Sequence, residues 1–162
     1  MRVAVTGASG FVGRHVIERL VAAGHDVRVL SHRTPPGRNS GITVVRGGLA
    51  DAPALAELVR DADVVVHAAG AVAAANEATF HRVNAEGTRR LAEAARDAGV
   101  SRFLLMSSLA ARRPDLSAYA ASKKAAEDAL AATEGLAWDA LRPPAVYGPG
   151  DRQVLIFFRL LK

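Results

Sequence analysis

The chain has 162 residues, of which half are hydrophobic and 23% are charged, and it contains no cysteine. This balance excludes an intrinsically disordered chain, and the length suits a single domain with a sizeable core. The lack of cysteine excludes disulfides, zinc–thiolate sites and cysteine nucleophiles. The formal charge is +5. The arginines are scattered rather than gathered in a stripe, so we expect a solvated basic surface and no nucleic-acid partner.

No segment of the sequence has the length or composition of a membrane anchor. The longest apolar run, residues 154–158, is far shorter than the ~20 residues that cross a bilayer. No secretory leader precedes the first strand-like segment at residues 3–5. We therefore expect a cytoplasmic protein without a membrane partner.

Strand-like and helix-like segments alternate along the chain. Runs of β-branched and aliphatic residues predict strands over 2–6, 26–30, 42–45, 63–67, 102–106 and 138–141. Periodic segments between them predict helices over 13–23, 53–60, 78–98 and 118–132, with Gly24, Gly99 and Gly135 beyond three of the ends. Strands that are apolar throughout are typical of a parallel sheet covered on both faces. The alternation predicts an α/β protein with a doubly wound parallel sheet, the Rossmann fold.

The first predicted strand leads directly into a glycine-rich turn and then into a helix. In this turn Gly7 allows a tight bend, Gly10 lets the backbone approach a pyrophosphate, and Gly13 permits close helix packing. Amides at the helix start, together with the positive end of the helix dipole, can hold the phosphates. The predicted dinucleotide-binding residues of this turn are Gly7, Ser9, Gly10, Phe11, Val12 and Gly13.

The residues after the second predicted strand bear on the choice of nicotinamide cofactor. Enzymes that use NAD usually place a carboxylate there for the ribose hydroxyls, but this chain has Ser31, His32 and Arg33. Arg33 can pair with a 2′-phosphate in fork geometry. We therefore expect NADP(H) to be preferred over NAD(H). The alternative is that Arg33 is only the first solvated residue of a loop.

A tyrosine and a lysine four residues apart open the last predicted helix. Tyr119 and Lys123 share one helix face, where an ammonium group stabilises a phenolate. Tyr119 can then exchange a proton with a substrate hydroxyl or carbonyl while hydride moves to or from a nicotinamide. Ser107 and Ser108, after the fifth strand, offer a hydroxyl to a developing oxyanion. His67 has no visible partner for binding metal, so we expect no metal site.

Together with the segments V-N-A-E-G-T (83–88) and L-R-P-P-A-V-Y-G-P-G-D (141–151), these motifs resemble those of extended short-chain dehydrogenases/reductases, the NAD-dependent epimerase/dehydratase family. The resemblance covers residues 1–151. It implies that Ser108 rather than Ser107 is the catalytic serine, and that Asn84 either supports Lys123 through a water or holds its helix in place. It implies a homodimer through the helices bearing Asn84 and Tyr119. Further cofactor contacts implied by the resemblance fall on Leu49, Ala68, Ala69, Gly70, Tyr119, Lys123 and Val146.

Two departures from the family pattern bear on the substrate. Nucleotide-sugar epimerases usually carry asparagine at the position of Ala145, which has no side-chain hydrogen-bonding group. The segment between Ser108 and Tyr119 is also short. Both features are similar to steroid-dehydrogenase-like and dihydroflavonol-reductase-like members. Gly48 replaces the acid that commonly meets adenine, which leaves that contact to backbone or to packing by Leu49.

Three functions remain open. The first is an NAD(P)-dependent oxidoreductase that transfers hydride between the nicotinamide and a small alcohol or carbonyl substrate, using Ser108, Tyr119 and Lys123. The second is a nucleotide-sugar epimerase or dehydratase with retained NAD. The third is a non-catalytic protein that binds NAD(P) in a structural or regulatory role. Extended members are about twice as long, so we expect a Rossmann domain over 1–151 and, over 152–162, the start of a substrate-binding region that is largely absent.

Overall fold

The computed structural model describes residues 1–32 and 41–151. Its strands are β1 (Arg2–Thr6), β2 (Asp26–Ser31), β3 (Ile42–Arg46), β4 (Val64–His67), β5 (Arg102–Met106) and β6 (Trp138–Leu141). Its α-helices are α1 (Phe11–Ala22), α2 (Ala52–Val59), α3 (Glu77–Phe80), α4 (Gly87–Asp97) and α5 (Ala118–Ala131). A π-helical segment, η1 (His81–Glu86), joins α3 to α4, and two 3₁₀-helices, η2 (Leu109–Arg112) and η3 (Pro114–Leu116), precede α5.

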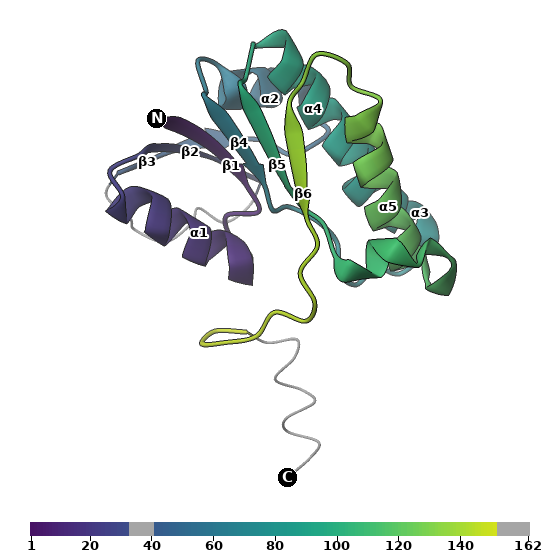
Figure 1. Ribbon diagram of the computed structural model, residues 1–162. Coiled ribbons are helices and arrows are strands. Elements are labelled where there is room, and N and C mark those ends of the chain that lie inside the picture. The colour runs from purple at the N-terminus through teal and green to yellow at the C-terminus, as the bar shows by residue number, and fades with distance from the viewer. Residues whose placement is uncertain (33–40, 152–162) are drawn as a thin grey trace.

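The described strands form one parallel sheet in the order β3-β2-β1-β4-β5-β6. The chain builds outward from β1 to β3 and then crosses to β4 on the other side of β1 (Figure 1). Val5 of β1 is in register with Val29 of β2 on one side and with Val66 of β4 on the other. In such sheets, ligands bind beyond the carboxyl ends of the strands where the direction of winding reverses.

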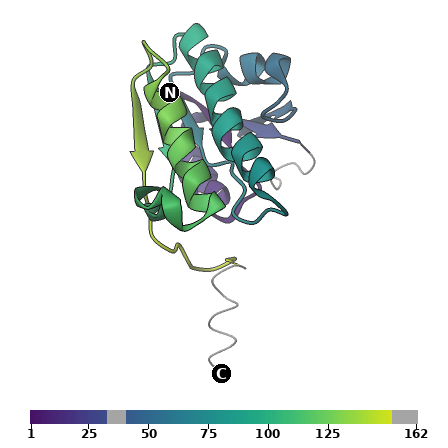
Figure 2. The ribbon, with the colours of Figure 1, turned by 90° about the vertical axis from the view of Figure 1, so that its right-hand side faces the viewer.

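The two faces of the sheet carry separate hydrophobic cores. On one face, Val3 and Val5 of β1 pack with Ile17 of α1. On the other face, Ala4 and Val65 belong to a cluster with buried residues of α2, α4 and α5. Figure 2 shows α4 and α5 side by side over this second face. Helices on both faces of an all-parallel sheet confirm the predicted doubly wound Rossmann fold.

The predicted elements agree with the structure to within two residues at each end, with one exception. The helix predicted over 78–98 is a succession of α3, η1 and α4, because a π turn interrupts the regular hydrogen bonding at residues 81–86. The 3₁₀-helices η2 and η3 were not predicted. Gly24, Gly99 and Gly135 all have positive φ angles after their helices, as expected for helix ends. Within the described residues, no helix has the length and apolar character needed to span a membrane.

Candidate functional site

The glycine-rich turn between β1 and α1 is built so closely that side chains are excluded from it. Gly7 has a φ of 77°, and a Cβ atom there would lie 2.4 Å from the carbonyl carbon of Ala68. A Cβ atom on Gly13 would lie 2.0 Å from the carbonyl oxygen of Gly7. The amide of Gly10 donates to that same oxygen over 2.9 Å. The turn therefore requires glycine at positions 7 and 13.

Helix α1 begins without a side-chain cap. Its N-cap residue is Gly10, whereas Asp51 at α2 and Ser117 at α5 accept hydrogen bonds from backbone amides of their own helices. The first turn of α1 carries no acidic residue. The free amides of this turn and the positive end of the helix dipole can therefore bind an anion. The pyrophosphate of a dinucleotide is an anion of this kind.

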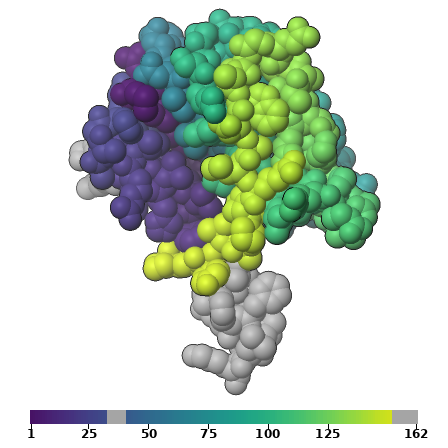
Figure 3. Space-filling model, in the orientation of Figure 1, coloured from purple at the N-terminus to yellow at the C-terminus, as the bar shows by residue number. Residues whose placement is uncertain are grey.

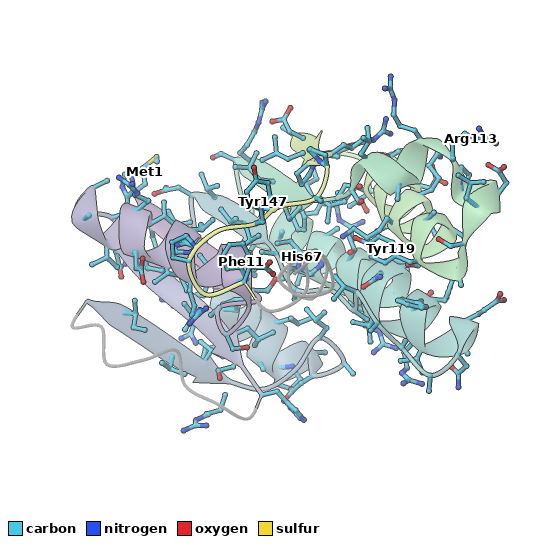
Figure 4. All side chains as sticks on the ribbon, turned by 90° about the horizontal axis from the view of Figure 1, so that it is seen from below. Met1, Phe11, His67, Arg113, Tyr119 and Tyr147 are labelled. Carbon is cyan, nitrogen blue, oxygen red and sulfur yellow. The ribbon has the colours of Figure 1, made fainter. Side chains whose placement is uncertain are left out.

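A cavity of about 880 Å³ lies at the carboxyl end of the sheet. Figure 3 shows the segment ending at residue 151, in yellow, passing between α1 (purple) and α5 (green) at this end of the molecule. In Figure 4, Phe11 lies on the side of α1 and Tyr119 on the side of α5. The predicted site residues that line the cavity are Ser9, Gly10, Phe11, Val12, Gly13, Ala68, Gly70, Ser108, Tyr119, Lys123 and Val146.

The other predicted site residues in the described part of the chain do not line this cavity. Leu49 packs against Gly87 of α4 and against the core on that face of the sheet. The amide of Ala69 donates to the Thr6 hydroxyl over 3.3 Å. Gly7 packs against Ala68 and Asn84 approaches Gly70, and Ala68 and Gly70 both line the cavity. Arg33, on which the expected preference for NADP(H) rests, is outside the described residues.

Lys123 is a buried cation at the edge of the cavity. Its Nζ donates a 2.6 Å hydrogen bond to the carbonyl oxygen of Met106, at the end of β5. Burial lowers the pKa of Lys123 from 10.5 to about 8, and the nearby Glu127 carboxylate opposes this shift. Tyr119 lies one helical turn earlier on α5, with its ring against Phe80. Lys123 and Tyr119 thus reach the same cavity from one helix.

The two serines after β5 have different partners. The Ser107 hydroxyl is buried and donates to Oε1 of Glu127 over 2.5 Å. The Ser108 hydroxyl lines the cavity and accepts from the amide of Ala110, the second residue of η2. In the described part of the chain no group accepts the Ser108 hydroxyl proton, which leaves that proton for a ligand.

Asn84, in the π turn η1, connects three elements. Its Oδ1 accepts from the amide of Ala71 over 2.7 Å, and its Nδ2 donates to the Ala71 carbonyl and to the Ser122 hydroxyl. The side chain therefore clamps the loop after β4 to α5. No direct hydrogen bond joins it to Lys123, although both approach Gly70.

His67 is fully buried and links β1 to α4. Thr88 donates its proton to the Asn84 carbonyl, so its oxygen accepts from Nε2 of His67 over 3.0 Å. Nδ1 is then the unprotonated nitrogen and accepts from the Thr6 hydroxyl. Burial lowers the pKa of His67 to about 3, and the Lys123 charge acts in the same direction. Within residues 1–32 and 41–151, no group of three or more acidic, histidine or cysteine side chains is placed to hold a metal.

Sequence reasoning missed Glu127 and Arg142. The Glu127 side chain is buried and accepts hydrogen bonds from two nitrogens of the Arg142 guanidinium, one of them over 2.8 Å. These two interactions, with the hydrogen bond from Ser107, hold the pKa of Glu127 below its usual range although burial alone would raise it. The sequence did contain an indication of Glu127: it lies four residues after Lys123 and eight after Tyr119, so all three share one face of the helix.

The chain is similar to several reductases. It is 49% identical over 161 residues to the ceramide reductase of Caulobacter vibrioides, covering 98% of this chain and 50% of that protein. It is 34% identical to the 2-alkyl-3-oxoalkanoate reductase of Stenotrophomonas maltophilia, over 96% of this chain and 54% of that protein. The chain thus spans about half the length of these relatives.

Solved structures share the fold along nearly the whole chain. The structure of MoeE5 with UDP-glucose and NAD matches 99% of this chain and 60% of its own, with a TM-score of 0.86 and 30% identity. The UDP-glucuronic acid 4-epimerase of Bacillus cereus with NAD matches 99% of this chain and 62% of its own, with a TM-score of 0.84 and 25% identity. The model of the NAD dependent epimerase/dehydratase family matches residues 3–159. With the glycine-rich turn and the parallel sheet, this shows that the chain belongs to the NAD-dependent epimerase/dehydratase family.

Proposed function

We propose that the chain carries the cofactor site and the catalytic side chains of an NAD(P)-dependent oxidoreductase acting on an alcohol or carbonyl substrate, with NADP(H) preferred. The observation that carries this proposal is that Ser108, Tyr119 and Lys123 line one cavity with the uncapped start of α1. Two of the relatives are named as reductases, which supports reduction as the direction. Ala145, also in the cavity lining, offers no side-chain hydrogen bond to a sugar nucleotide.

In the reduction, each side chain has a distinct task. The nicotinamide of a bound reduced cofactor would supply the hydride to the carbonyl carbon. The Ser108 hydroxyl donates a hydrogen bond to the carbonyl oxygen, and Tyr119 gives that oxygen its phenolic proton. The Lys123 ammonium, held by the Met106 carbonyl, stabilises the phenolate that remains.

A nucleotide-sugar epimerase or dehydratase is the second candidate. It is favoured by the likeness to structures that hold UDP-glucose or belong to a UDP-sugar epimerase. Such an enzyme would retain NAD, so cofactor that copurifies with the protein and survives dialysis would support this candidate and contradict the first.

The first test is cofactor binding. Nicotinamide fluorescence is followed while the protein is titrated with NADPH and with NADH, and the titrations are repeated with Arg33→Ala. We expect NADPH to bind more tightly and Arg33→Ala to remove the difference. Equal binding of both cofactors by the unmodified chain contradicts the NADP(H) preference, and binding of neither contradicts the dinucleotide site.

The second test is turnover of carbonyl compounds with the preferred cofactor. The chain has two tyrosines, so Tyr119→Phe has a matched control in Tyr147→Phe, whose side chain is exposed outside the cavity lining. Loss of the general acid should lower kcat about 100-fold or more, while cofactor affinity stays within a few-fold. Equal kcat values for the two variants contradict the role of Tyr119. Cofactor binding with no turnover of any substrate supports the non-catalytic alternative.

A further inference from the structure

Three successive residues at the end of β5 reach three different partners. The carbonyl oxygen of Met106 accepts from Lys123, and the hydroxyl of Ser107 donates to Glu127. Ser108, the next residue, lines the cavity. Glu127 thus anchors the residue directly before the proposed catalytic serine, and it lies one helical turn beyond the proposed catalytic lysine.

The Glu127 carboxylate is buried but not isolated. Glu127 is 4% exposed. It accepts from the Ser107 hydroxyl and from the Arg142 guanidinium, so its oxygens are satisfied on both sides. The Arg142 side chain is 40% exposed, and water screens its charge more than that of the carboxylate. The negative charge of Glu127 therefore remains effective toward the protein interior, where Lys123 lies.

We propose that Glu127 is a positioning residue that fixes the end of β5 through Ser107 and supplies the negative charge that balances the buried Lys123 ammonium. Its part in the reaction rests on the function proposed above; its effect on Lys123 does not. Burial lowers the pKa of Lys123, and the Glu127 carboxylate raises it again. Without that carboxylate the lysine would lose its proton at a lower pH. The neutral amine that remains has no positive charge to stabilise a phenolate on Tyr119.

Among the described groups around Lys123, it is the Glu127 carboxylate whose charge raises the pKa of the lysine. His67 of β4 is neutral above about pH 3, Asn84 of η1 is uncharged, and Met106 of β5 offers a carbonyl. Tyr119 of α5 is the group to be stabilised. In the segment after β6, Arg142 is bound to Glu127, and Asp151 lines the cavity.

Direct titration of the lysine tests the proposal. The chain has three lysines, Lys123, Lys124 and Lys162, so the side-chain methylene signals of ¹³C-lysine-labelled protein can be assigned by single Lys→Arg variants. In the unmodified chain we expect the pKa of Lys123 at about 8. Glu127→Gln should lower this pKa by about one unit, because the opposing charge is gone. Arg142→Gln should raise it, because Glu127 then lacks its counter-charge.

The matched control is Asp128→Asn, which removes a carboxylate from the next position of α5. Asp128 is exposed and pairs with Lys124, so its loss should leave the Lys123 transition in place. No shift with Glu127→Gln, or an equal shift with Asp128→Asn, overturns the proposal. If Glu127→Gln does not fold, Arg142→Gln decides, and a Lys123 pKa that falls or stays constant overturns the proposal.

The titration needs neither cofactor nor substrate, so its outcome is separate from that of the proposed reaction. In the turnover assay, the alkaline limb of kcat against pH should move with the Lys123 transition in Glu127→Gln and return toward that of the unmodified chain in Glu127→Asp. An alkaline limb that does not follow Lys123 overturns the catalytic part of the proposal. A shifted Lys123 in a protein that turns nothing over contradicts the reaction and leaves the charge assignment standing.

Discussion

The two ends of the cavity are built in opposite ways. At the β1–α1 end, the shape depends on the absence of side chains: Gly7 and Gly13 have no Cβ, and α1 has no capping side chain. At the β5–α5 end, the shape depends on side chains that are buried with their charges, Lys123 and Glu127. The first end is a backbone surface suited to phosphate, and the second is an electrostatic site suited to proton transfer. Substitutions should therefore break the first end by adding atoms and change the second by removing charge.

The largest effect is expected from Gly7→Ala, with Gly24→Ala as its matched control. The two glycines have φ angles of 77° and 76°, but a Cβ on Gly7 overlaps the backbone at Ala68, while nothing lies within 4 Å of one on Gly24. Gly24→Ala should cost roughly 1–2 kcal/mol for its backbone conformation alone. Gly7→Ala should cost more than about 3 kcal/mol and abolish cofactor binding. Chemical denaturation measures both, and equal costs would show that the close approach to Ala68 is relieved without penalty.

At the other end, Lys123→Met should make the protein more stable and inactive. Below about pH 8 the folded protein carries a buried ammonium, which lowers its stability. This cost decreases as the pH rises from about 8 and is gone above 10.5, where the lysine is neutral in both the folded and the unfolded state. The shift of the Lys123 pKa from 10.5 to about 8 corresponds to a cost of about 3 kcal/mol in the stability of the folded protein. Loss of the hydrogen bond to Met106 offsets about 1 kcal/mol of this. We therefore expect Lys123→Met to raise the free energy of unfolding by about 2 kcal/mol at pH 7. Lys124→Met, on the exposed side of the helix, should change stability by less than about 0.5 kcal/mol. A loss of stability in Lys123→Met at pH 7 would refute the assigned cost.

The smallest effect at neutral pH concerns His67, which lies between the two ends. The pKa of His67 is about 3 in the folded protein, whereas an ordinary histidine has a pKa of 6.5. Between pH 6.5 and about pH 3, the unfolded chain therefore binds one proton more than the folded protein. Stability is unaffected above pH 6.5 and should fall by about 1.4 kcal/mol per pH unit below it, until about pH 3. His67→Gln should remove this contribution to the slope between pH 6 and 4, whereas His81→Gln, at an exposed position, should not. Equal slopes for the two variants would place the acid sensitivity elsewhere.

The same contrast explains what the sequence could predict. The glycine-rich turn is encoded within a few consecutive residues between a strand and a helix, and the alternating pattern is enough for the sheet and its helices. Glu127 depends on Ser107 and Arg142, which come from other elements, so its role appears only once the chain is folded. The π turn around Asn84 was missed because its apolar spacing is that of an ordinary helix. Asn84 itself was identified by resemblance, but its partners Ala71 and Ser122 were not.

The uncapped start of α1 has a consequence for the whole nucleotide-binding half. Every other cap described above is made by the polypeptide, so those helices are complete on folding. The first turn of α1 has no such cap, and an anion bound from solution would satisfy its free amides. Because Phe11 and Val12 of that turn also line the cavity, a ligand bound there would stabilise the folded domain as well as occupy the site. A bound ligand would then serve as the cap that the sequence of α1 lacks.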